Sequence, residues 1–174
     1  IVYLAKMFPT VEWHLFDCRF DPRLEKNKNV YLELRYFRES DVKIFRDFAR
    51  EPDIDLYLIS DIRNLTYDSK SWSFEEMMKS WEDMELQRSW VEQIKPVYSM
   101  LKFKLPFPEP EVLEKIGDSV SYLPGIIYKQ PWARGKSVET RLIISSENMV
   151  PVEWSLKDFE EQMFYHNAVI RQEE

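Results

Sequence analysis

The chain has 174 residues and a net charge of −7, with 6 Trp, 9 Tyr, 11 Phe, 3 Gly and a single cysteine. One cysteine, Cys18, excludes an internal disulfide and a cysteine-based zinc site, and such sparse use of cysteine is typical of a reducing compartment. The scarcity of glycine argues against a glycine-rich phosphate loop in this sequence. The length suits one domain with a sizeable core, and no apolar run reaches the roughly 18 residues that a membrane span requires.

The charge is unevenly distributed along the chain. Residues 95–141 hold eight Lys/Arg and five Asp/Glu, a net +3, so the remainder carries −10. An acidic chain does not coat nucleic acid along its whole surface, but a local basic face allows a confined contact with RNA. The alternative is a surface of mixed charge without a partner, and the composition does not decide between the two.

The hydrophobic pattern predicts alternating helices and strands. In chain order it predicts a helix at 1–8 ended by Pro9, strands at 11–17 and 30–34, a helix at 40–50, a strand at 54–60, a polar loop at 65–72, a long helix from Ser73 to Pro96, a strand ending near Lys102, a loop and short helix at 105–118, strands at 122–128 and 140–145, and a helix at 156–170. Ser73 and Glu76 form a capping-box pattern at the start of the long helix. The alternation favours a Rossmann-like parallel sheet with helices on both faces. The continuous apolar run at 54–60 suits a strand that is covered on both sides.

Charged side chains stand at the ends of three of the predicted strands. Asp61 follows the strand at 54–60, Lys102 closes the strand before Pro106, and Glu139 opens the strand at 140–145. A lysine at the end of a buried strand is costly unless it faces a site, and ligand crevices of open α/β sheets lie at the carboxyl ends of the strands. If these strands are neighbours, the three side chains converge on one rim.

Five segments together carry a resemblance to a known family. They are Leu15-Phe16-Asp17-Cys18-Arg19, Ile59-Ser60-Asp61-Ile62-Arg63, Leu101-Lys102-Phe103-Lys104-Leu105-Pro106-Phe107-Pro108, Val138-Glu139-Thr140-Arg141-Leu142 and Glu147-Asn148-Met149. In this order and spacing, the chain resembles the poxvirus cap-specific mRNA 2′-O-methyltransferases, which also serve as stimulatory subunits of poly(A) polymerase. The likeness runs over nearly the whole chain.

The resemblance implies a fold and a setting. It implies a single methyltransferase domain over residues 1–174, built on a Rossmann-like sheet that binds S-adenosylmethionine. The family's first strand and glycine-rich cofactor loop are expected upstream of Ile1, so the domain is expected to be truncated at its N-terminus and poor at binding the cofactor alone. The implied partners are capped mRNA and a poly(A) polymerase catalytic subunit, with no membrane, in the cytoplasm, a viral factory or the virion.

The resemblance assigns the strand-end residues to catalysis. The family uses a Lys-Asp-Lys-Glu tetrad around the target ribose, and Asp61, Lys102 and Glu139 match its last three members, while the first lysine is expected upstream. A desolvated lysine beside other cations can draw the proton from a weakly acidic hydroxyl, or orient that hydroxyl. Without the resemblance, a lysine at a strand end is more simply explained as one that extends to solvent.

Cofactor contacts are implied near the first two strands. A strand-end acid often hydrogen-bonds a cofactor ribose in such folds, which suits Asp17 with Arg19 as its neighbour. Tyr36 and Phe37 match the segment that borders the adenine, and Asp61 would line both cofactor and target ribose. The alternatives are that the two aromatic residues belong to the core, and that Asp61 caps a helix or turn.

A cap-binding set is implied at a third place. Phe107 matches the residue that stacks on N7-methylguanine, whose positive charge strengthens stacking on an aromatic ring. Glu109 stands where the family has an aspartate, and Glu160 matches a glutamate on the last helix; both would accept hydrogen bonds from the guanine. The alternatives are an ordinary loop acid and a solvated helix face. His14 and His166 lack the spacing of metal ligands, so no metal site is predicted.

Three functions remain open from the sequence. The first is transfer of a methyl group from S-adenosylmethionine to the ribose 2′-hydroxyl of the first transcribed nucleotide of capped mRNA. The second is a methyltransferase-like subunit that binds capped RNA and supports a poly(A) polymerase without methyl transfer. The third is a 2′-O-methyltransferase for ribosomal or transfer RNA, which needs the Asp, Lys and Glu but not the cap-binding set.

Overall fold

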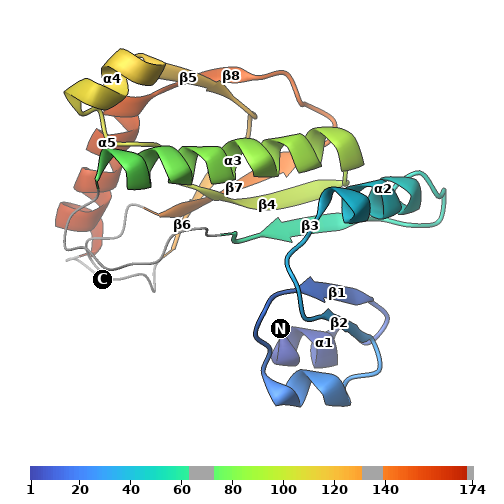
Figure 1. Cartoon of the computed structure of the whole chain (residues 1–174). Helices are drawn as coiled ribbons and strands as arrows, with labels where there is room; N and C mark the ends of the chain where they lie inside the picture. Colours follow the sequence, from blue (N-terminus) through green and yellow to red (C-terminus); the bar gives the residue numbers. More distant parts are fainter. Residues whose placement is uncertain (63–72, 131–138, 172–174) are drawn as a thin grey trace. The chain divides into compact units, whose positions relative to one another are not determined.

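The computed structural model describes residues 1–62, 73–130 and 139–171 (Figure 1). The predicted loop at 65–72 therefore lies outside the described residues. Contacts divide the chain into two compact units, residues 1–44 and 45–174, with the boundary inside helix α2 (Glu39–Phe48).

The first unit is a small two-stranded sheet with a helix before it. Helix α1 (Val2–Met7) is followed by β1 (Trp13–Phe16), a 3₁₀ helix (Pro22–Lys26) and β2 (Val30–Glu33). The two strands pair in parallel with Trp13 opposite Val30. The Asn29 side-chain amide donates to the carbonyls of Ala5, Phe8 and Val11 at 3.1, 3.2 and 2.9 Å, so it ties the end of α1 to the start of the sheet.

An ion pair fixes the entry to α2. Arg35 donates from Nη1 and Nη2 to the two carboxylate oxygens of the buried Asp41 at 2.7 and 2.8 Å, and the backbone N–H of Arg38 donates to the same carboxylate at 2.8 Å. The Arg35 guanidinium holds the pKa of Asp41 below its usual range. The guanidinium carbon also stands 5.1 Å from the centre of the Phe16 ring. This pair therefore links the carboxyl ends of β1 and β2 to the helix.

The second unit is built on a mixed sheet. Its strand order is β3 (Tyr57–Ser60), β4 (Tyr98–Phe103), β7 (Thr140–Ser145) and β6 (Ile126–Lys129). β3 and β4 are parallel, whereas β7 runs antiparallel to both β4 and β6. Within this sheet the expectation of parallel strands therefore holds only for β3 and β4; in the first unit it also holds for β1 and β2. One physical reason is that residues 130–139, which join β6 to β7, are fewer than the dozen or so that a parallel crossover needs.

The predicted strand at 122–128 is wrong as a single element. The chain forms β5 (Ser119–Tyr122), which pairs antiparallel with β8 (Val152–Ser155), and then β6 in the larger sheet. Pro124 lacks the N–H that a strand ladder needs. A Cβ atom at Gly125 would lie 2.5 Å from the Ile143 carbonyl oxygen, so the close approach of the two strands requires glycine there.

Helix α3 (Phe74–Ile94) covers one face of the sheet and begins as predicted. The Ser73 hydroxyl accepts from the Glu76 N–H at 3.2 Å, and the Glu76 carboxylate accepts from the Ser73 N–H at 2.8 Å, which completes the capping box. The helix ends at Lys95, whose φ of 57° is left-handed and breaks the helical repeat. The side-chain period seen in the sequence thus corresponds to one long helix along the sheet (Figure 1).

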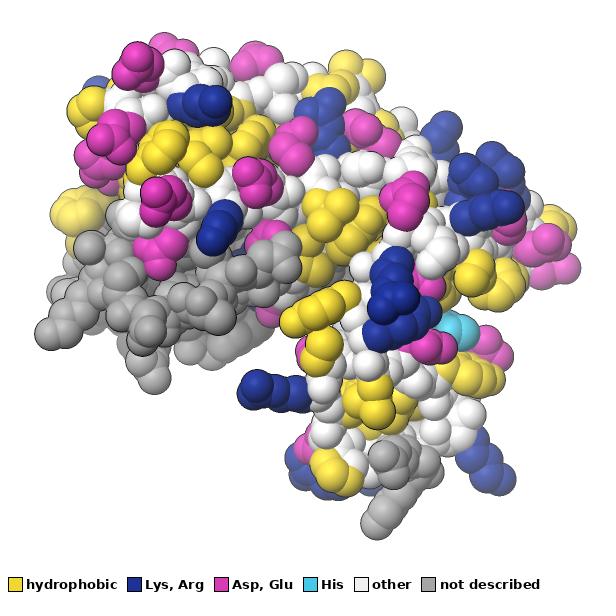
Figure 2. All heavy atoms as spheres, in the orientation of Figure 1, with side chains coloured by type: hydrophobic (Ala, Val, Ile, Leu, Met, Phe, Trp, Pro, Cys, Tyr) yellow, Lys and Arg dark blue, Asp and Glu magenta, His cyan; other side chains and the backbone are white. Residues whose placement is uncertain are grey.

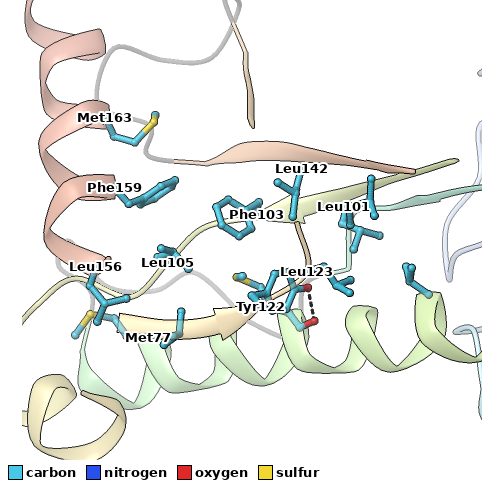
Figure 3. Packing of buried hydrophobic residues seen from close by; sticks show 14 of the residues in the cluster. Met77, Leu101, Phe103, Leu105, Tyr122, Leu123, Leu142, Leu156, Phe159 and Met163 are labelled. Atoms are coloured by element: carbon cyan, nitrogen blue, oxygen red, sulfur yellow. Dashed lines mark hydrogen bonds between the residues drawn. The ribbon is translucent and has the colours of Figure 1, made fainter. Parts of the chain in front are cut away.

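The core lies between this sheet face, α3 and α5 (Leu156–Tyr165), as Figure 3 shows. Phe103 is at its centre, with the rings of Tyr122, Trp154 and Phe159 centred 5.9, 4.9 and 5.5 Å away. The buried Tyr122 hydroxyl donates to the Met84 carbonyl at 2.7 Å and so joins β5 to α3. The short helix α4 (Pro110–Ile116) adds the fully buried Val112 to the same core.

Two further expectations are corrected. The predicted helix at 156–170 is α-helical only as far as Tyr165 and continues as a π-helical turn, His166–Ile170. The sequence predicts a strand at 54–60 that is covered on both faces, but Tyr57 and Ile59 of β3 are 60% and 55% exposed. Tyr57 instead stacks on Tyr98 of β4, with ring centres 6.4 Å apart. Within the described ranges, no helix has the length and apolar character to cross a bilayer.

Candidate active site

The structure brings together the three charged residues that the sequence places at strand ends. Asp61 directly follows β3, Lys102 is the penultimate residue of β4, and Glu139 directly precedes β7. Because β7 runs antiparallel to β4, its amino end meets the carboxyl ends of β3 and β4 at one edge of the sheet. The predicted convergence on a single rim is therefore observed.

Lys102 lies between two carboxylates. Its Nζ atom stands 3.4 Å from Asp61 Oδ1 and 3.3 Å from Glu139 Oε2. The Lys102 side chain is only 9% exposed, against 18% for Glu139 and 60% for Asp61. The ammonium is thus held inside the rim, while the Asp61 side of the cluster is open to a ligand.

The two carboxylates share a second cation. Arg141 Nη1 donates to Glu139 Oε1 at 2.9 Å, and Arg141 Nη2 lies 3.1 Å from Asp61 Oδ2. Arg141 stands opposite Lys102 in the β4–β7 register, so both side chains project from the same face of the sheet. We call Asp61, Lys102, Glu139 and Arg141 the strand-end quartet; its formal charges balance.

The Lys102 ammonium keeps unused donor capacity. Charge-assisted N–H···O bonds are usually about 2.7–2.9 Å long, so its contacts of 3.3 and 3.4 Å are long. The Nζ atom is inaccessible to solvent and has no hydrogen-bond acceptor among the residues the structure describes. Such a group can donate a hydrogen bond to a hydroxyl that enters beside Asp61, because its carboxylate partners hold it without using all of its N–H donors.

Four of the predicted cofactor residues, Asp17, Arg19, Tyr36 and Phe37, belong to the first unit, whereas Asp61 belongs to the second. Asp17 follows β1, and its Oδ1 accepts from the Arg19 N–H at 3.0 Å. Tyr36 follows β2 and is 71% exposed, so it is not a core aromatic residue. Cys18 beside it, together with the charge of Asp17, raises the pKa of the Tyr36 phenol. Phe37 packs edge-on against Phe16 with ring centres 5.0 Å apart, which fits the alternative of a packing role for that residue.

The predicted cap-binding residues stand on two segments of the second unit. Phe107 packs against the core in the loop after β4, and Lys104 Nζ lies 5.4 Å from the centre of its ring. The exposed Glu109 is the N-cap of α4 and donates its N–H to the Phe107 carbonyl at 2.8 Å. Glu160 is a partly exposed residue of α5, next to Phe159, which contacts Phe103. These segments meet the core at the same end of β4, but no contact between Phe107 and Glu160 is among the interactions described.

Sequence reasoning missed two residues around Lys102. Arg141 appeared only within a matching segment, although its place two residues after Glu139 puts both on one face of a strand. The second is Gln87, which is completely buried on α3 and hydrogen-bonds the Lys102 backbone. The sequence does contain a sign of this role, because Gln87 is a polar residue on the apolar face of the predicted helix.

Charged side chains are also found outside the quartet, on the surface of the protein. On the face seen in Figure 2, Lys/Arg and Asp/Glu side chains are interspersed. Part of the basic segment at 95–141, including Arg134 and Lys136, lies outside the described residues. In the ranges that are described, no group of His, Cys, Asp and Glu side chains is arranged to hold a metal ion.

Comparison with known proteins identifies the family. A family model described as "Poly A polymerase regulatory subunit" matches residues 1–174, which is the whole chain. The chain therefore belongs to the poly(A) polymerase regulatory subunit family. This membership confirms the family that the five sequence segments indicated.

One relative that aligns with nearly the whole chain has a name that states an enzymatic activity. The Fowlpox virus (strain NVSL) protein "Cap-specific mRNA (nucleoside-2'-O-)-methyltransferase" is 32% identical over 177 residues, covering 97% of this chain and 53% of the relative. The chain thus spans about half the length of that relative. The mixed α/β architecture of this family member is compatible with a methyltransferase-like fold.

Proposed function

We propose that this chain is part of a methyltransferase that acts on the ribose 2′-hydroxyl of the first transcribed nucleotide of capped mRNA, on a Rossmann-like sheet. The observation that carries the proposal is the strand-end quartet, with Lys102 Nζ held between Asp61 and Glu139. Support comes from the name of the Fowlpox virus relative. A 2′-hydroxyl is weakly acidic and must be oriented, which is the task such a lysine suits.

The quartet supplies orientation and proton handling. We assign Lys102 Nζ to contact the target hydroxyl, which enters from the open Asp61 side. As a neutral amine, Nζ would accept the hydroxyl proton; as an ammonium, it would donate a hydrogen bond to the hydroxyl oxygen and so orient the lone pair that attacks. Asp61 and Glu139 fix its position, and Arg141 holds those carboxylates from the far side. Holding the reacting groups in line can account for a large share of the rate acceleration of methyl transfer.

The cofactor proposal is S-adenosylmethionine. When bound, it supplies the methyl group that is transferred. The exposed carboxylate of Asp17 suits hydrogen bonds from ribose hydroxyls, and the exposed ring of Tyr36 suits contact with an adenine. Arg19 and Phe37 border these two side chains, and Asp61 is assigned to both cofactor and target ribose. The chemistry of these residues fits the group.

The substrate proposal is capped mRNA. We assign Phe107 to stack on the N7-methylguanine, and Glu109 and Glu160 to accept hydrogen bonds from the guanine edge. One face of the Phe107 ring is occupied by Lys104, so a guanine would stack on the other. In this assignment, methylguanine recognition and methyl transfer use the two ends of one segment, residues 102–109.

Membership in the family favours a second role as well. Its description as a poly(A) polymerase regulatory subunit supports a partnership with a poly(A) polymerase catalytic subunit. We propose the cytoplasm, a viral factory or the virion as the place of that partnership. This role and methyl transfer are compatible with each other. A subunit that only binds RNA would keep its affinity for the cap when the quartet is altered.

The proposal is tested by methyl transfer with matched RNAs. The full-length protein is incubated with labelled S-adenosylmethionine and one RNA sequence, either with an N7-methylguanine cap or with a 5′-triphosphate. We expect label in the capped RNA alone. Equal labelling of both would favour a 2′-O-methyltransferase for other RNAs. Binding of the cap without label in either RNA would favour the non-catalytic subunit.

A further inference from the structure

The buried face of helix α3 contains a polar residue, Gln87, at a position where apolar residues are usual. The buried face includes Met84, Val91 and Ile94, and Gln87 stands between them, three residues after Met84 and four before Val91. Gln87 is fully buried, with an exposure of 0%. A buried carboxamide is costly unless its donor and acceptor are both satisfied, so its presence here needs a reason.

Both ends of that carboxamide hydrogen-bond the same residue. Gln87 Nε2 donates to the Lys102 carbonyl oxygen at 3.2 Å, and the Lys102 N–H donates to Gln87 Oε1 at 3.2 Å. The carboxamide of Gln87 therefore bonds both the backbone N–H and the backbone carbonyl of Lys102. This fixes where Lys102 stands along the strand and how its backbone is rotated, because two bonds from one rigid amide resist both shifts.

The Gln87 side chain bonds β4 just beyond the last residue that pairs with β3. Ser60, the last residue of β3, stands opposite Leu101, so Lys102 is the first residue of β4 beyond the paired length of β3. The neighbours Leu101 and Phe103 point into the core, and Lys102 points to the opposite face. Gln87 thus reaches from the core side to the backbone of the residue whose side chain serves the quartet.

We infer that Gln87 is a positioning residue that holds the Lys102 backbone so that Nζ stays between Asp61 and Glu139. The inference rests on the proposed function, in which Lys102 contacts the target hydroxyl. Gln87 touches no substrate and acts only through Lys102. A nearby hydrogen bond of a purely structural kind, from the Tyr122 hydroxyl to the Met84 carbonyl at 2.7 Å, also ends on α3 but does not contact Lys102.

The test compares Gln87→Met with Tyr122→Phe in the full-length protein. Methionine has a similar length and no amide, and each variant removes buried hydrogen bonds on the same helix. With capped RNA we expect Gln87→Met to lower kcat by about 100-fold, the size of loss that a small misplacement of a catalytic group causes. KM values for RNA and S-adenosylmethionine should stay within a few-fold, and Tyr122→Phe should keep kcat within a few-fold even if its melting temperature falls.

A second variant and a direct readout keep the inference falsifiable if Gln87→Met folds poorly. Gln87→Glu keeps the shape and the acceptor for the Lys102 N–H, but its carboxylate cannot donate to the Lys102 carbonyl, so we expect a loss in kcat of the same direction. In Gln87→Met, NMR-detected hydrogen exchange of the Lys102 amide should accelerate while that of Leu101 is unchanged. Near wild-type kcat in both Gln87 variants would overturn the inference, as would equal losses in Gln87→Met and Tyr122→Phe.

The outcome for Lys102 itself separates this inference from the proposed function. If Lys102→Ala abolishes transfer while Gln87→Met keeps kcat, only the positioning role of Gln87 fails. If Lys102→Ala remains active, the catalytic role assigned to Lys102 fails, and the positioning role of Gln87 fails with it. If the wild-type protein transfers no methyl group to capped RNA, the proposed function itself fails.

Discussion

Replacing Lys102 with alanine is expected to reduce methyl transfer to capped RNA by roughly 10²–10⁴-fold, the usual contribution of a positioned proton-transfer group. The change removes the ammonium of the quartet, which has unused donor capacity toward an entering hydroxyl. Cap affinity should stay within a few-fold, because Lys102 contacts the ribose and not the guanine in this proposal. Labelled S-adenosylmethionine for transfer and fluorescence titration with a cap analogue for binding provide the two measurements.

Two companion variants sharpen that experiment. Lys102→Arg keeps a positive charge between Asp61 and Glu139, but a guanidinium cannot give up its proton and has a different shape, so we expect it to be nearly as inactive as alanine. Lys157→Ala removes a surface lysine that is 75% exposed and pairs with Glu161 at 3.7 Å, and it should behave as wild type. Transfer by Lys102→Ala at a rate near that of Lys157→Ala would rule out a catalytic role for Lys102.

Replacing Phe107 with alanine is expected to weaken binding of N7-methylguanine far more than binding of guanine. Loss of one stacking face costs roughly 1–3 kcal/mol, and the positive charge of the methylated ring adds a contribution that guanine lacks. Titration of both nucleotides against wild type and variant measures the difference. Transfer to a saturating concentration of capped RNA should change less than the affinity does.

The control for Phe107 is another phenylalanine of the same unit. Phe164 on α5 is 71% exposed, so Phe164→Ala should leave both affinities unchanged. Because Phe107 also packs against the core, the melting temperature of Phe107→Ala must be measured alongside. Equal losses for methylated and unmethylated guanine would show that Phe107 only packs the loop.

The sequence predicts a helix or strand well where its signal is local, such as a cap, an apolar period or a run of β-type residues. The capping box at Ser73 and the apolar period after it define α3, and the run of β-type residues at 140–145 coincides with β7. The strand-end positions of Asp61, Lys102 and Glu139 also follow from the sequence, since an apolar run that ends in a charge predicts a residue at the edge of a sheet.

Other features depend on partners that are distant in the sequence. β8 and the division between β5 and β6 depend on which strands pair, and Gly125 reveals its role only through the Ile143 carbonyl facing it. Gln87 and Lys102 are joined across a helix and a strand, and Arg141 is placed beside Asp61 by the β4–β7 register. Such contacts are set by tertiary packing, so residue spacing alone predicts them poorly.

The claim that the quartet serves a ribose 2′-hydroxyl is tested most directly with RNA that lacks that group. Two capped RNAs of identical sequence are compared, one natural and one with a 2′-deoxyribose at the first transcribed nucleotide only, with the full-length protein and labelled S-adenosylmethionine. We expect the natural RNA to be labelled and the deoxy RNA to remain unlabelled, although both bind equally. Equal labelling of the two RNAs would contradict that claim, because the methyl group would then be going to another atom.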